Sequence, residues 1–227
     1  MLVEALGWLV DPANWQGPDG LLVRLGEHLW FTVRVVLIAA VIAVPLGLWV
    51  GHSGRGGVTL VGAANAMRAL PTLGLVTFLF LLSPSTPVLV TIAGLVVLAV
   101  PPILAGAYAG VQSVDGRVTD AAIGMGMTGW QRLWQAEVPG SLPLLVGGVR
   151  NAALQVVATV TVAAYVGVGG LGEPLLVGLA INEYPQVAAV ALVTAVLAVA
   201  VDTVLAVVQR LVVPNGLRLA ASAAGAT

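Results

Sequence analysis

The sequence predicts an all-α integral membrane protein with about five transmembrane helices. Of the 227 residues, 59% are hydrophobic and only 8% are charged, whereas about 25% of an average soluble domain is charged. So few charges cannot cover a surface that faces water. The chain also contains long apolar stretches, and a hydrocarbon core of ~30 Å needs about 20 apolar residues of helix. Because lipid offers the backbone no hydrogen-bond partners, these stretches are expected to be helices rather than strands.

The expected spans follow directly from these stretches. They cover residues 29–50, 58–82, 88–111, 142–168 and 187–213. Proline is tolerated inside membrane helices where neighbouring groups satisfy the freed carbonyls. Pro71, Pro101 and Pro102 are therefore predicted to kink the second and third spans rather than to end them.

One membrane domain is expected, with a short segment at each end. Residues 1–27 are predicted to be an extracytoplasmic segment whose short amphipathic helix ends at Asp11-Pro12. This segment carries Glu4 and has no basic n-region, so it does not have the pattern of a secretory signal. The transmembrane domain is expected over residues 28–214, and residues 215–227 are expected to be a flexible tail.

The arginines predict how the chain is oriented, because cytoplasmic loops carry an excess of basic residues. Arg24 alone is expected on one side of the membrane. Six arginines are expected on the other side: Arg55, Arg117, Arg132, Arg150, Arg210 and Arg218. This distribution puts the N-terminus outside the cell, and it puts the C-terminus and residues 112–140 in the cytoplasm. An odd number of spans agrees with these placements.

Residues 112–140 form the polar segment between the third and fourth spans. Asp120 is expected at a helix start, where a carboxylate caps free N–H groups and suits the helix dipole. Ala121 and Ala122 would leave a thin helix face that can enter a groove on a partner protein. Gly126 would permit a sharp turn after this short helix.

An apolar stripe is expected further along this segment. Trp130, Leu133 and Trp134 recur at helical spacing and suit either the membrane interface or a partner protein. Pro139 ends the segment. The alternative to a docking segment is an ordinary amphipathic helix that lies at the membrane interface.

The spacing of these residues resembles the EAA loop of ABC importer permeases. That pattern has an acidic-Ala-Ala triplet followed at fixed distances by Gly and Pro, and this chain matches it at Asp120, Ala121, Ala122, Gly126 and Pro139. Asp stands in place of the usual Glu, and Ala136 and Val138 stand in place of the usual Ile and Leu. The resemblance implies a type I importer permease in which this loop holds the coupling helix.

Further segments extend the resemblance over residues 27–214. They are similar to permeases for the quaternary-amine osmoprotectants glycine betaine, choline and carnitine: His28-Leu29, Pro45-Leu46-Gly47, Arg68-Ala69-Leu70-Pro71, Tyr108-Ala109-Gly110, Gly148-Val149-Arg150 and Gly167-Val168-Gly169-Gly170-Leu171-Gly172. Methionine-type permeases share a similar Gly-Gly-Leu-Gly stretch, so an amino-acid importer is the alternative. Ala105-Gly106-Ala107 departs from the osmoprotectant family, which often has a more polar stretch there.

The resemblance implies a transport subunit rather than an enzyme. Its implied partners are two cytoplasmic ATPase subunits, a second permease that is identical or paralogous, an extracytoplasmic substrate-binding protein and the lipid bilayer. The ATPase subunits would use ATP, and no cofactor would bind directly to this chain. The implied location is the plasma membrane of a prokaryote.

Two other groups of residues are candidate sites. Gly167, Gly169, Gly170 and Gly172 follow the fourth span and permit close backbone approach. They are interpreted as a gate at the outer mouth, with a plain extracellular turn as the alternative.

The second group consists of Arg68, Tyr108 and Asp202, which lie within the expected spans. An ionisable residue in the membrane is a functional hypothesis by default. Arg68 is close enough to the cytoplasmic edge for its side chain to reach the interface, which favours a structural role. Asp202 is its suggested partner.

Composition and motifs exclude several other functions. The chain has no cysteine and only two histidines, too few for a thiolate or histidine metal site. It has no G-x-x-x-x-G-K-[ST] phosphate loop for ATP, and its net charge of −1 gives no reason to expect nucleic-acid binding. Two rivals are left open. A secondary transporter would need intramembrane carboxylates, of which only Asp202 is available, and a membrane scaffold would not need the loop pattern.

Overall fold

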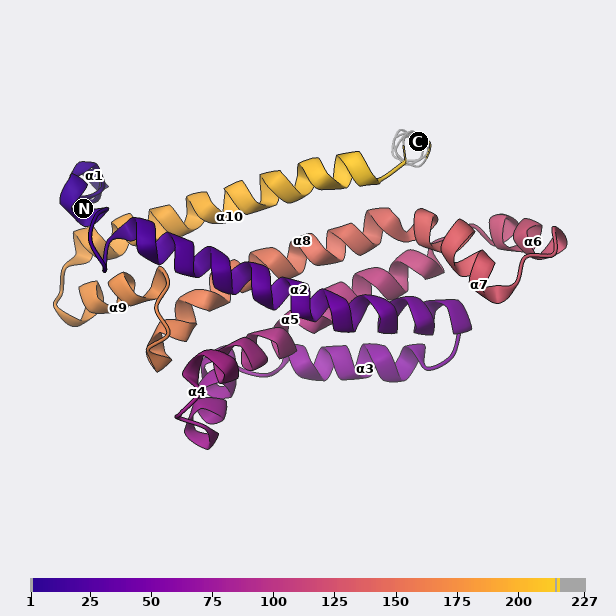
Figure 1. Ribbon diagram of the computed structural model, residues 1–227, viewed down its shortest axis with the longest axis horizontal. Coiled ribbons are helices and arrows are strands. Elements are labelled where there is room, and N and C mark those ends of the chain that lie inside the picture. The colour runs from indigo at the N-terminus through magenta and orange to yellow at the C-terminus, as the bar shows by residue number, and fades with distance from the viewer. Residues whose placement is uncertain (1, 215, 217–227) are drawn as a thin grey trace. The chain divides into compact units, whose positions relative to one another are not determined.

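The computed structural model describes residues 2–214 and residue 216, and every regular element within residues 2–214 is a helix (Figure 1). The all-α prediction is confirmed. Nearly all of the tail expected at residues 215–227 lies outside the described residues. The chain divides into two compact units, which are described separately. Unit 1 comprises Met1–Ile38, Ala69–Ala99 and Ala153–Asp202, and unit 2 comprises Ala39–Arg68, Val100–Ala152 and Thr203–Thr227.

Within the residues that the structure describes, four helical runs are long and apolar enough to cross a membrane. They contain α2 (Leu21–Ser53), α5 (Pro87–Gln112), α8 (Val138–Ala163) and α10 (Tyr184–Val212). These helices correspond to the first, third, fourth and fifth expected spans. Pro101 and Pro102 lie inside α5, which confirms that they do not end the third span.

The second expected span is broken, and here the prediction about Pro71 is wrong. α3 (Gly57–Arg68) and α4 (Thr72–Leu82) are separate helices, and Pro71 precedes α4 with an extended backbone (φ −69°, ψ 122°). The proline ring removes a backbone donor and disfavours the α conformation at Leu70, and at this proline the helix ends. If the broken pair counts as one span, the described part of the chain has five candidate spans.

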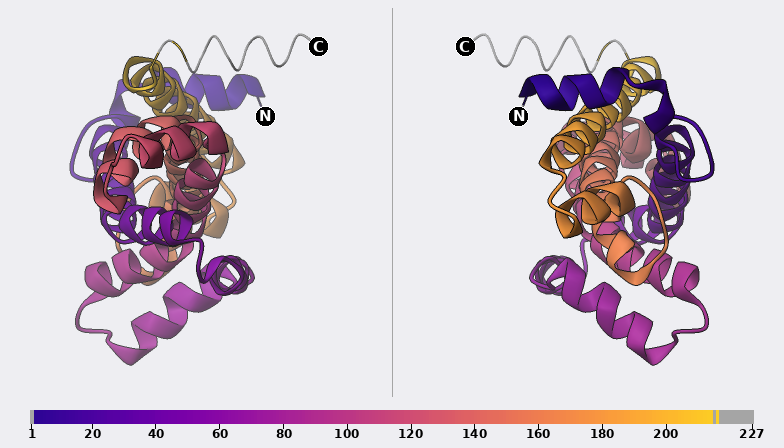
Figure 2. Two further views of the ribbon diagram at one scale, coloured as in Figure 1. Left: turned by 90° about the vertical axis from the view of Figure 1, so that its right-hand side faces the viewer. Right: turned by 90° about the vertical axis from the view of Figure 1, so that its left-hand side faces the viewer.

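In unit 1, the N-terminal helix α1 (Leu2–Val10) ends before Asp11-Pro12, as expected. The carboxylate of Asp11 accepts a 2.9 Å hydrogen bond from the N–H of Ala13 and so starts the 3-10 turn η1 (Pro12–Asn14). Helix α1 and the start of α10 lie at the same end of the unit (Figure 2, right).

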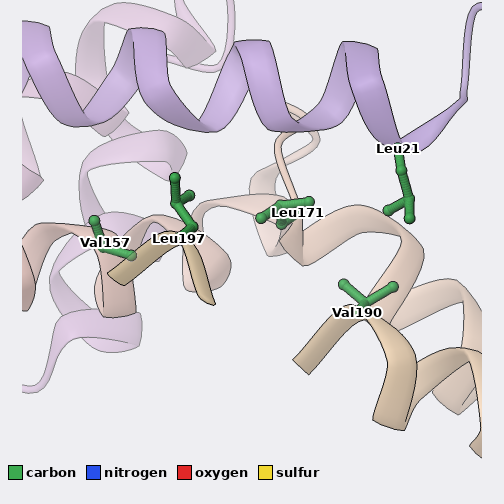
Figure 3. Close-up of a cluster of buried hydrophobic side chains, with 5 residues drawn as sticks. All are labelled: Leu21, Val157, Leu171, Val190 and Leu197. Atoms are coloured by element: carbon green, nitrogen blue, oxygen red, sulfur yellow. The ribbon is translucent and has the colours of Figure 1, made fainter. Parts of the chain in front are cut away.

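The apolar core of unit 1 joins four parts of the chain (Figure 3). Its fully or nearly fully buried members are Leu21 from α2, Val157 from α8, Leu171 from the turn that follows α8, and Val190 and Leu197 from α10. Trp8, Leu9 and Trp15 from the N-terminal segment pack against this cluster. The core therefore holds both the N-terminal segment and the turn around Leu171 against α2 and α10.

Residues 169–185 are not a plain connection, because they contain α9 (Gly172–Ala180). Signals for this helix are present in the sequence: Glu173 lies in the first turn, where an acidic side chain suits the helix dipole, and Pro174 is tolerated near a helix start. A side chain at Gly172 would collide with the carbonyl group of Thr161. The chain can therefore turn back at this point only with glycine.

In unit 2, the ends of α2 and α5 pack closely. A Cβ atom at Gly47 would lie 2.7 Å from that of Ala107, and one at Gly51 would lie 2.8 Å from that of Val111. Small residues let membrane helices approach in this way. The Nε2 atom of Gln112 also donates a 2.9 Å hydrogen bond to the carbonyl oxygen of Gly51. These contacts make the two helix ends one packed body.

Candidate functional site

The segment expected to contact a partner begins with the short helix α6 (Gly116–Gly124), which faces the viewer in Figure 2, left. Asp115 caps this helix: its carboxylate accepts from the N–H of Arg117 at 2.9 Å and from the Arg117 guanidinium at 2.7 Å. Hydrogen bonding to this guanidinium lowers the pKa of the Asp115 carboxyl. Asp120 lies inside α6 and is exposed. The prediction that Asp120 starts the helix is therefore wrong.

A Schellman motif ends α6 at Gly126. This glycine has a left-handed backbone (φ 79°), and its N–H donates to the carbonyl of Ile123 at 2.9 Å. The N–H of Met127 donates to the carbonyl of Ala122 at 3.1 Å. This pair of bonds is the hydrogen-bond pattern of the motif, which favours glycine at the left-handed position. The sharp turn predicted at Gly126 is present.

The next helical run begins at once and contains a π turn. Thr128 and Gln131 form a reciprocal capping box at the start of α7 (Gly129–Arg132). Residues Leu133–Glu137 form the π turn η2, in which the N–H of Val138 bonds to the carbonyl of Leu133. Pro139 follows this turn. Because proline has no N–H and clashes with the carbonyl four residues earlier, a wider turn before it relieves the conflict.

The docking segment, defined as residues 115–139, presents several large apolar side chains to the outside. The exposed ones are Val118, Ile123, Met125, Trp130 and Trp134. The rings of Trp130 and Trp134 contact each other edge to face, with centroids 5.5 Å apart. Leu133 points the other way and is buried against α2 and α5, and Ala122 is also buried. Exposed apolar groups on an otherwise polar segment are typical of an interaction surface.

A buried charged group joins the docking segment to the end of α2. We call His52, Arg132 and Glu137 the His–Arg–Glu cluster. Glu137 is only 4% exposed; its Oε2 atom lies 2.5 Å from Nδ1 of His52, and its Oε1 atom lies 2.8 Å from Nε of Arg132. The guanidinium of Arg132 also approaches Nδ1 of His52, at 3.4 Å, so the three side chains contact one another.

Unit 1 holds the second candidate site, the glycine turn of residues 167–172. Gly167, Gly169 and Gly170 have φ values of 73°, 82° and 77°, a region that other residues rarely adopt. The N–H of Gly170 donates to Oε2 of Glu27 at 2.8 Å. A Cβ atom at Gly169 would lie 2.5 Å from the same oxygen. Gly169 and Gly170 thus lie in direct contact with α2.

His28 and Arg24 complete the contacts between α2 and the glycine turn. His28 is fully buried: its Nδ1 accepts from the N–H of Leu171 at 3.3 Å, so its Nε2 carries the proton that it donates to the Val157 carbonyl at 2.9 Å. Arg24 forms ion pairs with three carboxylates, at 2.7 Å to Asp19, 3.1 Å to Glu27 and 2.8 Å to Glu173.

The three candidates within the spans have different surroundings. Arg68 is exposed at the end of α3. Tyr108 is half-buried in α5, and a Cβ atom added at Gly57 would lie 2.5 Å from its hydroxyl oxygen. Asp202 is half-buried in α10. The suggested pairing of Arg68 with Asp202 stays a prediction.

Sequence reasoning missed Glu27, His28, His52 and Glu137. Each is an ionisable residue inside, or next to, an apolar stretch, and that placement alone is a signal for a buried polar contact. Their partners could not be found, because the contacts bring together residues 85 to 143 positions apart.

The fold and these sites define a helical membrane protein that spans the bilayer several times and carries, between two spans, a polar segment with exposed apolar side chains. Comparison with known proteins gives the family. Residues 43–215 match the family described as "Binding-protein-dependent transport system inner membrane component". The chain belongs to this family.

Two relatives cover nearly the whole chain. The glycine betaine/carnitine/choline transport system permease protein OpuCB of Bacillus subtilis (strain 168) is 32% identical over 198 residues, which cover 87% of this chain and 91% of that protein. The carnitine transport permease protein OpuCD of Listeria monocytogenes serotype 1/2a (strain 10403S) is 33% identical over 216 residues, which cover 93% and 95%. The chain thus resembles permeases of osmoprotectant importers.

A solved structure shows the same fold. The chain matches an inward-facing form of the MetNI methionine ABC transporter with a TM-score of 0.75 and 21% identity, over 90% of this chain and 99% of that one. The type I permease fold expected from the sequence is confirmed.

Proposed function

We propose that this chain is the membrane-spanning subunit of an ATP-driven importer for a small osmoprotectant such as glycine betaine, choline or carnitine. The observation that carries the proposal is the docking segment: a capped helix with a Gly126 turn and exposed tryptophans, in a member of the binding-protein-dependent permease family. The relatives named for these solutes are about 30% identical over most of the chain, which favours osmoprotectants over methionine.

The partners follow from this proposal. Two cytoplasmic ATPase subunits bind the docking segments of two permease subunits, which are identical or paralogous, and an extracytoplasmic binding protein delivers the solute. The N-terminus is outside and the C-terminus inside, as the arginine distribution favours. ATP acts in the partner subunits, and this chain needs no cofactor of its own.

The mechanism is alternating access. ATP-driven closure of the ATPase subunits moves the docking segments, and rigid-body rocking of packed helices opens the pathway to one side and then to the other. In this scheme Asp120, Ala121 and Trp130 belong to the exposed contact surface. Gly126 sets its turn, and the glycine turn 167–172 lies at the outer gate.

Reconstitution with the ATPase subunits and binding protein in proteoliposomes tests the proposal. We expect ATP-dependent uptake of radiolabelled betaine, choline or carnitine that exceeds uptake of methionine. The chain should also co-purify with the ATPase subunits. Failure of wild-type protein to bind an ATPase, or a strict preference for methionine, would contradict the proposal.

A matched pair of variants tests the docking segment itself. Gly126→Pro cannot keep a positive φ angle, so it should reduce transport-coupled ATPase activity by roughly tenfold, equivalent to about 1.4 kcal/mol. Gly124→Ala is the control, because it has an ordinary backbone and no neighbouring atom within 4 Å of the added methyl group. Normal coupling in an assembled Gly126→Pro complex would count against the docking role.

A further inference from the structure

We propose that Glu137 is a positioning residue that transmits movement of the docking segment to α2 through His52. This inference rests on the proposed function, because it concerns how motion enters the membrane helices.

The first argument is burial. A carboxylate that is 4% exposed is costly to desolvate unless partners compensate for the lost water. Glu137 has two such partners. Arg132 belongs to the same helical run, but His52 lies 85 positions away at the end of α2. The cluster thus forms a polar link between the docking segment and a membrane helix, and it cannot break without leaving buried charge unpaired.

The second argument is the π turn. Residues five positions apart point in different directions on an α-helix, because each residue advances about 100° around the axis. The π turn η2 (Leu133–Glu137) widens the helix directly after Arg132. The Nε atom of Arg132 and the Oε1 atom of Glu137 lie 2.8 Å apart, an ion-pair distance without the alignment of a hydrogen bond. The π turn that relieves the conflict at Pro139 is therefore also the turn that brings Arg132 and Glu137 together in the cluster.

The third argument is the packing of the α2 end, next to His52, against α5. The preceding residue, Gly51, packs against Val111 of α5, and its carbonyl accepts a hydrogen bond from Gln112. A displacement of Glu137 is therefore passed to two packed helix ends rather than to a free one. Leu133, from the same π turn, is buried in that packing and supports the link with apolar contact.

The test compares carboxylate-to-amide variants in the reconstituted complex. In Glu137→Gln the side chain is uncharged and an NH2 donor replaces one of the two acceptor oxygens, so the ion pair with Arg132 is lost. We expect the complex to assemble, while stimulation of its ATPase activity by the binding protein and the amount of solute transported per ATP fall by about fivefold or more, the lower end of coupling between sites. Glu183→Gln is the chemically matched control at an exposed position and should behave as wild type.

A covalent link separates a positioning role from a purely structural one. The chain has no native cysteine, so His52→Cys/Glu137→Cys can be cross-linked specifically with a short bifunctional thiol reagent that reductant cleaves. The cross-linked complex should regain coupling, and cleavage in the same sample should abolish it again. This variant also carries the test if Glu137→Gln fails to assemble.

The outcomes distinguish the two proposals. If wild-type complex transports but Glu137→Gln couples normally, the positioning role is wrong and the importer function stands. If the cross-link forms without restoring coupling, the link through His52 is wrong. If wild-type complex shows no ATP-dependent uptake, the proposed function fails, and this inference fails with it.

Discussion

The main-chain N–H of Gly170 donates a 2.8 Å hydrogen bond to the carboxylate of Glu27, a residue 143 positions earlier in the chain. This bond fixes the glycine turn to α2 in unit 1. The same carboxylate is paired with Arg24, which is also paired with Glu173 at the start of α9. This bond and the other features described above lead to five predictions.

The glycine turn should tolerate a methyl group at one position and not at another. Gly169→Ala and Gly167→Ala both carry the strain of a left-handed backbone, but only the first places a Cβ atom 2.5 Å from Glu27. We expect Gly169→Ala to unfold roughly 5 °C below Gly167→Ala, because overpacking costs about 1–3 kcal/mol and each kcal/mol shifts the midpoint by about 2–4 °C. Thermal unfolding in detergent at one scan rate measures this. Equal midpoints would mean that Glu27 moves aside freely.

Adjacent glycines in α8 should differ in the same way. A Cβ atom at Gly148 would lie 2.6 Å from the carbonyl oxygen of Pro102 in α5, whereas Gly147 has no atom within 4 Å. Backbone cannot move aside as a side chain can, so Gly148→Ala should lower the unfolding midpoint by roughly 5 °C or more. Gly147→Ala should leave it unchanged. Matching values for the two variants would contradict close packing of α5 on α8 at this point.

The two aspartates of α6 should have separable effects. Asp115→Ala removes the helix cap and should speed hydrogen exchange of the first amides of α6, whereas Asp120→Ala should leave exchange unchanged and weaken binding of the ATPase. Mass spectrometry of the intact complex in nanodiscs measures the first effect. Faster exchange in Asp120→Ala than in Asp115→Ala would reverse the assignment of the cap.

The cap at Asp115 also has a predictable pH dependence. Its pKa is lower in the folded protein than in the unfolded chain, because Arg117 binds the ionised form. The cap is therefore fully present above the unfolded pKa of about 3.9 and is lost only as pH falls through the lower folded value. The protection factors of the α6 amides, which correct for the intrinsic pH dependence of exchange, should consequently be insensitive to this group at neutral pH and fall only in acid.

The orientation can be read from two single-cysteine variants. Val3 and Met125 are 82% and 71% exposed, and the chain has no other thiol. In intact cells a membrane-impermeant maleimide should label Val3→Cys at once and Met125→Cys only after permeabilisation. Labelling of Met125→Cys from outside would place the docking segment where no cytoplasmic ATPase can reach it.

The parts of the fold that depend on local chemistry could be predicted from the sequence. The long spans depend on uninterrupted apolar runs, and the turn at Gly126 depends on a residue type that alone adopts a positive φ angle without strain. The local sequence does not show which aspartate caps α6, because Asp115 and Asp120 are both good caps and the choice depends on where the helix begins. Pro71 was misjudged for a similar reason: Pro101, Pro102 and Pro71 share one local signal, and only the surroundings decide whether a helix continues.

The polar contacts could not be predicted because they are long-range. In the sequence, His52 and Glu137 are each an isolated ionisable residue near the end of an apolar stretch. Neither local sequence indicates that the two side chains contact each other. The π turn that orients Arg132 toward Glu137 could not be predicted either, since the sequence around Pro139 indicates an ordinary α-helix. Candidate residues were therefore found where a motif was continuous and missed where two distant segments formed the site together.

The break between α3 and α4 limits where this part of the chain can lie. The last carbonyl groups of α3 and the first N–H groups of α4 have no partners within their own helices. Residues 68–71 are exposed in this chain, and an unsatisfied backbone group in hydrocarbon costs several kcal/mol. The break must therefore face water, lipid headgroups or another protein surface. An acyl-chain environment on all sides is excluded for these four residues.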